Sequence, residues 1–183
     1  TDTMALERAR GITIRAAVAS LVAPGTDPPL RINLVDTPGH PDFIAEVERS
    51  LAVLDGVVLV VSAVEGVQPQ TRILMRAVRR LALRTVFFVN KLDRTGADLE
   101  RVTEQLRTRL TPHVVPMGTA VAPGTGAAGF AALGDAGRRA LDVLADRDDA
   151  LLRRYVEGPT VGADEAHRHL VTLTRAATVH PVY

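Results

Sequence analysis

The sequence predicts an α/β fold with a mostly parallel sheet flanked by helices. Two continuous runs of β-branched residues and leucine or phenylalanine, at 57–61 and 85–89, are typical of strands buried on both faces of a parallel sheet. Between them, residues 69–81 repeat apolar side chains at helical spacing. Short connections between such elements are typical of parallel sheets, whose functional residues gather at the carboxyl ends of the strands.

The N-terminal part of the chain predicts a hairpin followed by a helix. Residues 12–22 and 30–35 are β-branched and apolar, so both are expected as strands. A turn rich in proline and glycine at 24–29 separates them, which favours antiparallel pairing. Residues 41–54 begin with proline and place their apolar side chains on one helical face, so a helix is predicted there.

The C-terminal part predicts helices and one long irregular segment. Helices are expected at 99–110, 135–156 with a break near 146–149, and 164–177, and a strand begins at 180. Residues 111–134 are rich in glycine, proline and alanine and lack a period, so we expect a linker or a poorly ordered insertion. A G-x-G-x-x-G pattern at 124–129 follows no predicted strand, so a flexible linker is favoured there over a dinucleotide site.

Composition restricts the possible functions. The chain has 183 residues, 22 basic and 21 acidic, which fits one domain, or one with an appendage, and no overall basic surface for nucleic acid. Any nucleic-acid contact must therefore be local. Cysteine is absent, which excludes disulfides and thiolate chemistry, and no apolar run reaches membrane-spanning length. We expect a cytoplasmic location and no membrane partner.

A short polar segment, Asp36 to His40, follows the predicted strand at 30–35. An aspartate at the end of a strand can bind Mg²⁺ through a water, and Gly39 lets a backbone N–H approach a terminal phosphate. His40 can orient an attacking water. Aspartate and glycine are also common in turns, so an ordinary strand-to-helix turn is the more frequent interpretation of the segment alone.

A second polar segment, Asn90 to Asp93, follows the predicted strand at 85–89. It contains Lys91, the only lysine of the chain, and one of its two asparagines. A carboxylate there can accept hydrogen bonds from both N1–H and the amine of guanine, which adenine cannot offer. A solvated polar turn is the alternative, and it becomes the less favoured one when the Asp36 segment is considered as well.

A threonine precedes the predicted hairpin. The Thr13 hydroxyl can ligate Mg²⁺ and its backbone N–H can meet a γ-phosphate. Taken alone, Thr13 fits an ordinary strand residue better.

Together these segments resemble the GTP-binding domain of translational GTPases of the elongation factor G class. The matching stretches are Arg10 to Ile14 (switch I), Asp36 to Phe43 (switch II) and Asn90 to Asp93 (guanine recognition). The resemblance is nearly continuous over 1–98 and resumes over 149–183. Within the class, Gly66 to Leu74 is most similar to the tetracycline-resistance ribosomal protection proteins.

The resemblance implies a P-loop-NTPase-like fold that binds GTP with Mg²⁺ and hydrolyses it to GDP and phosphate. On the phosphate side, Thr13 and Asp36 would hold Mg²⁺, with Thr13 also sensing the γ-phosphate that the Gly39 N–H contacts. His40 would be the catalytic residue that positions the hydrolytic water.

On the base side, the resemblance implies that Asn90 and Asp93 read guanine while Lys91 packs on the base. The ribosome is the implied partner, reached mainly through domains outside this chain. No direct sequence-specific contact with nucleic acid is expected.

The chain departs from the family pattern in its phosphate loop. G-x-x-x-x-G-K-[ST] does not occur in residues 1–183, and the Ser-Ala guanine loop expected after Tyr183 is absent. We therefore expect an incomplete sheet with an exposed edge. We also expect the isolated chain to bind GTP poorly and to hydrolyse it negligibly.

The predicted organisation is a core of the GTP-binding domain over 1–98 and a C-terminal helical and linker insertion over 99–183, which leads to the last strand of the same domain. Three functions remain open at this point. Ribosomal protection against tetracycline is favoured. A translocation factor of the elongation factor G type and a truncated product without nucleotide activity are the alternatives.

Overall fold

The computed structural model describes residues 17–25, 27–37, 44–157 and 161–183, and the chain divides into two compact units, Thr1–Leu54 and Asp55–Tyr183. In the first unit, strand β1 (Ala17–Ala23) pairs antiparallel with β2 (Leu30–Asp36), which confirms the predicted hairpin. Helix α2 (Ile44–Leu51) follows. The expected start of β1 at 12–16 and of the helix at 41–43 lies outside the described residues.

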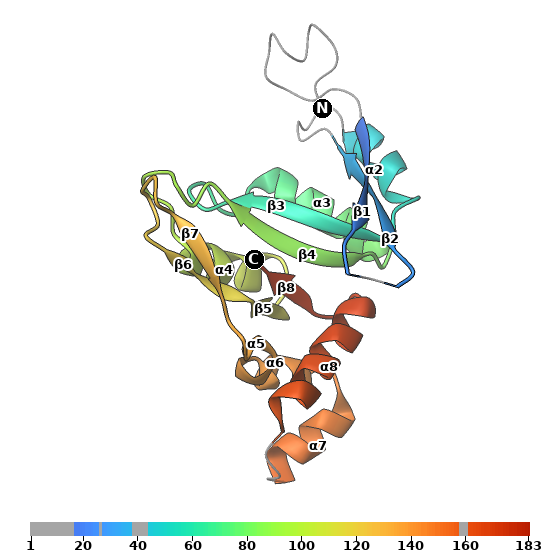
Figure 1. Cartoon of the computed structure of the whole chain (residues 1–183), viewed down its shortest axis with the longest axis vertical. Coiled ribbons are helices and arrows are strands. Elements are labelled where there is room, and N and C mark those ends of the chain that lie inside the picture. The colour runs from blue at the N-terminus through green and yellow to red at the C-terminus, as the bar shows by residue number, and fades with distance from the viewer. Residues whose placement is uncertain (1–16, 26, 38–43, 158–160) are drawn as a thin grey trace, which may run out of the picture. The chain divides into compact units, whose positions relative to one another are not determined.

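The second unit contains a parallel sheet of four strands in the order β3-β4-β8-β5 (Figure 1). The strands are β3 (Gly56–Ser62), β4 (Arg84–Asn90), β8 (His180–Val182) and β5 (Val114–Pro116). Each neighbouring pair is parallel. The predicted α/β class with a mostly parallel sheet is therefore confirmed.

Helices α3 (Pro69–Arg80) and α4 (Leu99–Arg109) cover one face of this sheet. Proline stands at the first helical position of α3, where its missing N–H costs nothing. The Asp98 side chain caps α4 by accepting from the backbone N–H of Arg101. The core between helices and sheet includes four fully buried residues from β4, α4 and β5: Phe87, Val102, Leu106 and Val114.

The opposite face of the sheet is more exposed than the sequence predicts. The apolar run at 57–61 is predicted to be buried on both sides, but Val58 and Val60 are 58% and 56% exposed, and Phe88 of β4 is 46% exposed. The cause is that α3 and α4 pack on the same side, against Leu59 and Val61. Burial therefore alternates along β3 among the described residues, as in a sheet with one covered face.

Residues 111–134 also differ from expectation, because they form strands rather than a linker. After β5, strands β6 (Gly118–Val121) and β7 (Gly129–Ala132) make an antiparallel hairpin. Runs this short show too few repeats for a period to appear in the sequence. The G-x-G-x-x-G pattern is the hairpin loop. There the Gly124 N–H, at φ +79°, donates to the carbonyl oxygen of Leu92 at 2.7 Å.

A helical segment completes the second unit. Helices α5 (Ala136–Arg139), α6 (Leu141–Ala145), α7 (Asp149–Glu157) and α8 (Ala163–Arg175) enclose a second apolar cluster, and α8 leads into β8. The predicted break near 146–149 is confirmed. Asp148 starts α7 by accepting from the backbone N–H of Ala150 and Leu151, and its other oxygen lies 2.8 Å from Nδ1 of His169. No helix in the described ranges is both long and apolar enough to cross a bilayer.

Candidate nucleotide site

The predicted site residues of the second unit lie where β3 and β4 end side by side. Ser62, the last residue of β3, is paired with Asn90, the last residue of β4. The backbone N–H of Ala63 donates to the carbonyl oxygen of Asn90 at 2.7 Å. The loops that follow the two strands therefore start as hydrogen-bonded neighbours, as expected for the carboxyl edge of a parallel sheet.

The turn after β4 is fixed by the side chain of Asn90. Its Oδ1 accepts from the backbone N–H of Lys91 at 2.8 Å, and the Lys91 carbonyl accepts from the N–H of Arg94 at 3.2 Å. Lys91 itself has φ +64°, in the left-handed region that a lysine rarely adopts. Such backbone conformations persist where the surroundings determine them, and they concentrate at ligand sites.

The charged side chains of this turn are accessible and only weakly paired. Lys91 Nζ lies 3.4 Å from Oε1 of Glu65, and Asp93 Oδ2 lies 3.6 Å from Nε of Arg94, all four side chains being largely exposed. Exposed ion pairs contribute at most about 1 kcal/mol. A bound ligand can therefore replace the ion-pair partners of Lys91 and Asp93 at little cost in free energy.

Glu65 was not anticipated from the sequence, although it faces Lys91 from the loop after β3. Hydrogen bonding with the Ser62 side chain lowers the pKa of the Glu65 carboxyl, and the charge of Lys91 lowers it further. Glu65 and Gly66 follow an apolar strand run, just as the two predicted site segments do. This position after a predicted strand is the sequence feature from which Glu65 could have been found.

Helix α4 holds the loop after β3 from one side. Arg101 donates from Nη2 to the carbonyl oxygens of Ala63 and Val64, at 2.9 and 2.8 Å. Gln105, one turn further on, accepts from the backbone N–H of Val67 at 2.9 Å. These residues position the loop without reaching the site, and no sequence pattern marks them because both side chains bond to backbone atoms.

The remaining predicted site residues belong to the first unit. Asp36 is the last residue of β2 and lies half-buried opposite Ala17. Thr13, Gly39 and His40 lie outside the described residues. Within the described ranges, no group of three or more histidine or acidic side chains could bind a metal ion, so the Mg²⁺ ligands stay a prediction.

Comparison with known protein families gives a match over most of the chain. The model of the elongation factor Tu GTP binding domain matches residues 1–174. The oxytetracycline resistance protein of Streptomyces rimosus is 52% identical over 100% of this chain and 28% of its own length. The tetracycline resistance protein TetM of Streptomyces lividans is 48% identical over 97% of this chain and 27% of its own length.

A similar solved structure supports the same relationship at the level of the backbone. A crystal structure of a protein from Thermus thermophilus superposes with a TM-score of 0.79 and 26% identity, covering 100% of this chain and 31% of the other. The chain thus spans less than a third of the length of each of these relatives.

Proposed function

The chain belongs to the elongation factor Tu GTP-binding domain family, and we propose that it is the guanine-reading part of a ribosomal protection GTPase. The observation that carries the proposal is the Asn90–Asp93 turn at the carboxyl edge of the sheet. Its backbone is fixed by hydrogen bonds while its charged side chains are accessible. The whole protein would hydrolyse GTP to GDP and phosphate in the cytoplasm, on the ribosome, and so counteract tetracycline.

In this proposal the base is read by Asp93 and supported by Lys91. The Asp93 carboxylate accepts from N1–H and from the exocyclic amine of guanine, replacing its weak contact with Arg94. The Lys91 stem covers one face of the base while Asn90 keeps the turn in shape. Adenine leaves the carboxylate without its two donors, which is the kind of mismatch that gives strong discrimination.

The phosphate side of the proposal rests on residues of the first unit. Asp36 stands at the end of β2, where an oxygen ligand can bind Mg²⁺ through a water, and Thr13 would supply a second oxygen. Mg²⁺ would neutralise charge on the phosphates. Gly39 would contact the γ-phosphate through its N–H, and His40 would position the attacking water.

The base-reading role is tested by converting the carboxylate to an amide. Asp93→Asn should change the preference from GTP to xanthosine triphosphate by at least about tenfold, because the amide donates where the carboxylate accepted. Asp142→Asn, a change on α6, is the matched control and should leave the preference unchanged. Binding is followed by ¹H–¹⁵N chemical shifts, which detect millimolar affinities.

Two results would overturn the proposal. One is an Asp93→Asn variant with the same preference as the unchanged chain. The other is the absence of any shift at 90–93 when GTP and Mg²⁺ are added at millimolar concentration.

Translocation of the elongation factor G type remains the alternative function of the whole protein. The names of the two Streptomyces relatives favour drug resistance. In a cell-free translation reaction inhibited by tetracycline, a protection protein should restore synthesis, whereas a translocation factor should restore synthesis only where elongation factor G has been removed.

A further inference from the structure

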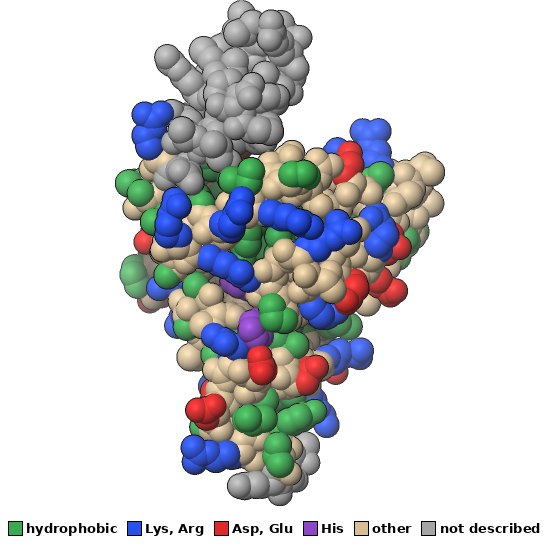
Figure 2. All heavy atoms as spheres, turned by 180° about the vertical axis from the view of Figure 1, so that it is seen from behind, with side chains coloured by type: hydrophobic (Ala, Val, Ile, Leu, Met, Phe, Trp, Pro, Cys, Tyr) green, Lys and Arg blue, Asp and Glu red, His purple; other side chains and the backbone are tan. Residues whose placement is uncertain are grey.

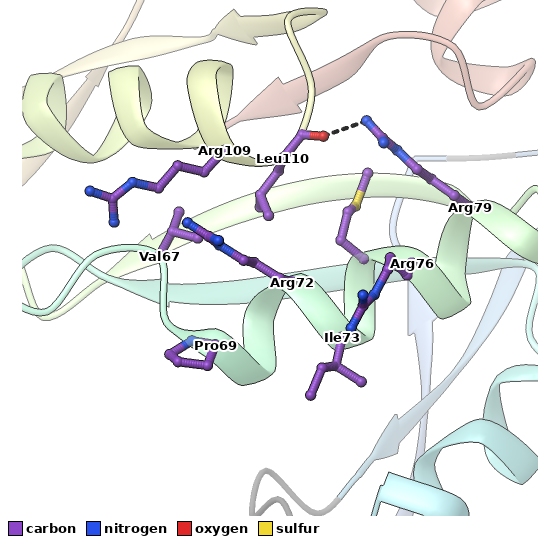
Figure 3. Close-up of a pocket in the computed structure, with 9 residues that line it drawn as sticks. Val67, Pro69, Arg72, Ile73, Arg76, Arg79, Arg109 and Leu110 are labelled. Carbon is purple, nitrogen blue, oxygen red and sulfur yellow. Dashed lines mark hydrogen bonds between the residues drawn. The ribbon is translucent and has the colours of Figure 1, made fainter.

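A groove lined by arginines lies on the second unit, between α3 and the end of α4. Its volume is about 670 Å³. Figure 3 shows Arg72 extending from α3 toward the end of α4, where Arg109 lies, while Arg79 crosses to the carbonyl of Leu110 at the other end. It shares no residue with the Asn90–Asp93 turn or with the loop contacts of Arg101.

The arginines of this groove repeat along one helix face. Arg72, Arg76 and Arg79 are separated by four and three positions, which places them on the same side of α3 at intervals of about 6 and about 4.5 Å along its axis. Helix α3 contains no acidic residue to offset them. Blue side chains gather over the middle of the face seen in Figure 2.

Most of this charge is not neutralised within the described chain. Among the described residues, no carboxylate lies within ion-pair distance of Arg72, Arg76 or Arg109. The Glu104 carboxylate of α4 is 2.7 Å from Arg107, so it is already occupied. Like charges at helical i, i+4 spacing repel one another, and a bound polyanion would relieve that repulsion.

The floor of the groove offers little to a protein partner. Three of its apolar residues, Val67, Met75 and Leu110, are only 6%, 2% and 7% exposed. Pro69 and Ile73 are exposed, but Figure 3 shows Ile73 extending from α3 away from α4. Protein interfaces depend on apolar or aromatic anchors that fill accessible pockets. Accessible guanidinium groups in a row over a covered floor fit a ligand that carries regularly spaced negative charge instead.

We propose that this arginine groove binds the phosphodiester backbone of RNA, without reading its base sequence. A planar guanidinium donates two parallel hydrogen bonds to phosphate oxygens, which a lysine cannot do. Contacts of this kind position a protein on RNA but carry no sequence information. The near-zero net charge of the chain gives no sign of this surface, because the acidic residues that balance its arginines lie outside α3.

The test is binding of a fluorescein-labelled RNA duplex, measured by anisotropy over a series of salt concentrations. The groove variant is Arg72→Gln, Arg76→Gln and Arg109→Gln, which keeps Arg79 because it caps the Leu110 carbonyl. The matched control is Arg138→Gln, Arg153→Gln and Arg168→Gln, three exposed arginines on α5, α7 and α8. Both variants lose the same charge, and circular dichroism checks that both fold.

The groove variant should bind at least about tenfold more weakly at 100 mM salt, with the slope of log K against log salt reduced by about 2 to 3. The control variant should bind like the unchanged chain, and a duplex of another sequence should bind equally well. Equal losses in both variants, no binding by the unchanged chain, or preferential binding of poly-L-glutamate would each overturn the proposal. The last result would assign the groove to an acidic protein.

Discussion

Strands β2 and β4 are equal in length and have very different surroundings. Both have seven residues, most of the later ones apolar, and both end in a polar residue of the candidate site. In β2, Leu30 and Leu34 are each 54% exposed, whereas in β4 Phe87 and Val89 are 0% and 3% exposed. The difference follows from neighbours, since in the described part of the chain β2 pairs with β1 alone, while β4 lies between β3 and β8 under α3 and α4.

The two strands differ in what fixes the residue at their carboxyl end. Asn90 is held because the adjacent strand and its loop supply hydrogen bonds to the turn. The hairpin is held by its backbone ladder and by the side-chain bond from Ser20 Oγ to Asn33 Oδ1, at 2.6 Å, which lies in the middle of the strands. An apolar run thus predicts a strand, but the neighbouring strands and helices determine how well the residue at its end is held in position.

The largest expected effect is the loss of the core side chain in β4. Phe87→Ala should lower the free energy of unfolding by about 3 to 5 kcal/mol, because a fully buried ring is removed and a cavity remains. Leu34→Ala in β2 should cost less than about 1 kcal/mol, since the leucine is already half in water. Urea unfolding followed by circular dichroism measures both, and similar values for the two would remove the distinction.

The next effect concerns pH and the buried His180 of β8. Burial lowers its pKa from 6.5 to about 4, aided by the nearby charges of Arg79 and His113 and opposed by its bond to the Thr85 carbonyl. As the pH falls, His180 is therefore protonated in the unfolded chain before it is protonated in the folded chain. The folded state has its full stability above pH 6.5 and loses stability as the pH falls to about 4. The total loss of unfolding free energy is on the order of 3 kcal/mol.

Replacement of this histidine isolates its contribution. His180→Leu replaces the titrating side chain of β8 with an apolar one and should flatten the dependence of stability on pH between pH 6.5 and 4, measured by urea unfolding at half-unit intervals. His167→Gln, an exposed change on α8, should leave the profile as it is. A His180→Leu profile with the original slope would show that other groups titrate there.

The smallest expected effect tests how α4 holds the site loop. Arg101→Gln removes the donors to the carbonyls of Ala63 and Val64 and should cost about 1 to 2 kcal/mol. Hydrogen exchange should also become faster at residues 63–67. Arg107→Gln on the same helix removes only a surface pair with Glu104 and should cost less than about 0.5 kcal/mol. Unchanged exchange at 63–67 would deny Arg101 its positioning role.

Much of the fold could be predicted from periodicity, and parts of the site from strand ends. The parallel strands and long helices follow from continuous apolar runs and helical repeats. The hairpin β6–β7 could not be predicted, because each of its strands is only four residues long. It also requires a glycine at position 118, since a Cβ there would overlap the Phe130 ring, and only the structure shows this contact. The one-sided burial of β3 depends on which face of the sheet the helices cover, and the local sequence pattern contains no information about this.

Within the candidate site, residue type and spacing were enough to propose Asn90, Lys91 and Asp93, because the chemistry expected of them resides in their own side chains. Arg101 and Glu65 became visible only in three dimensions, because they act on backbone atoms and on a lysine 26 positions away. The roles of all the predicted site residues remain predictions, those of Asn90, Lys91 and Asp93 as much as those of Thr13, Asp36, Gly39 and His40. The domain division between residues 98 and 99 also remains a prediction.

Strand β8 lies inside the sheet but comes late in the chain. His180 meets the Thr85 carbonyl across 95 positions of sequence, and in the described sheet β8 joins β4 to β5. At a synthesis rate of about 5 to 20 residues per second, β4 emerges roughly 5 to 20 s before its partner. During that interval the edge of β4 that β8 later covers is open, and an open strand edge can pair with another chain.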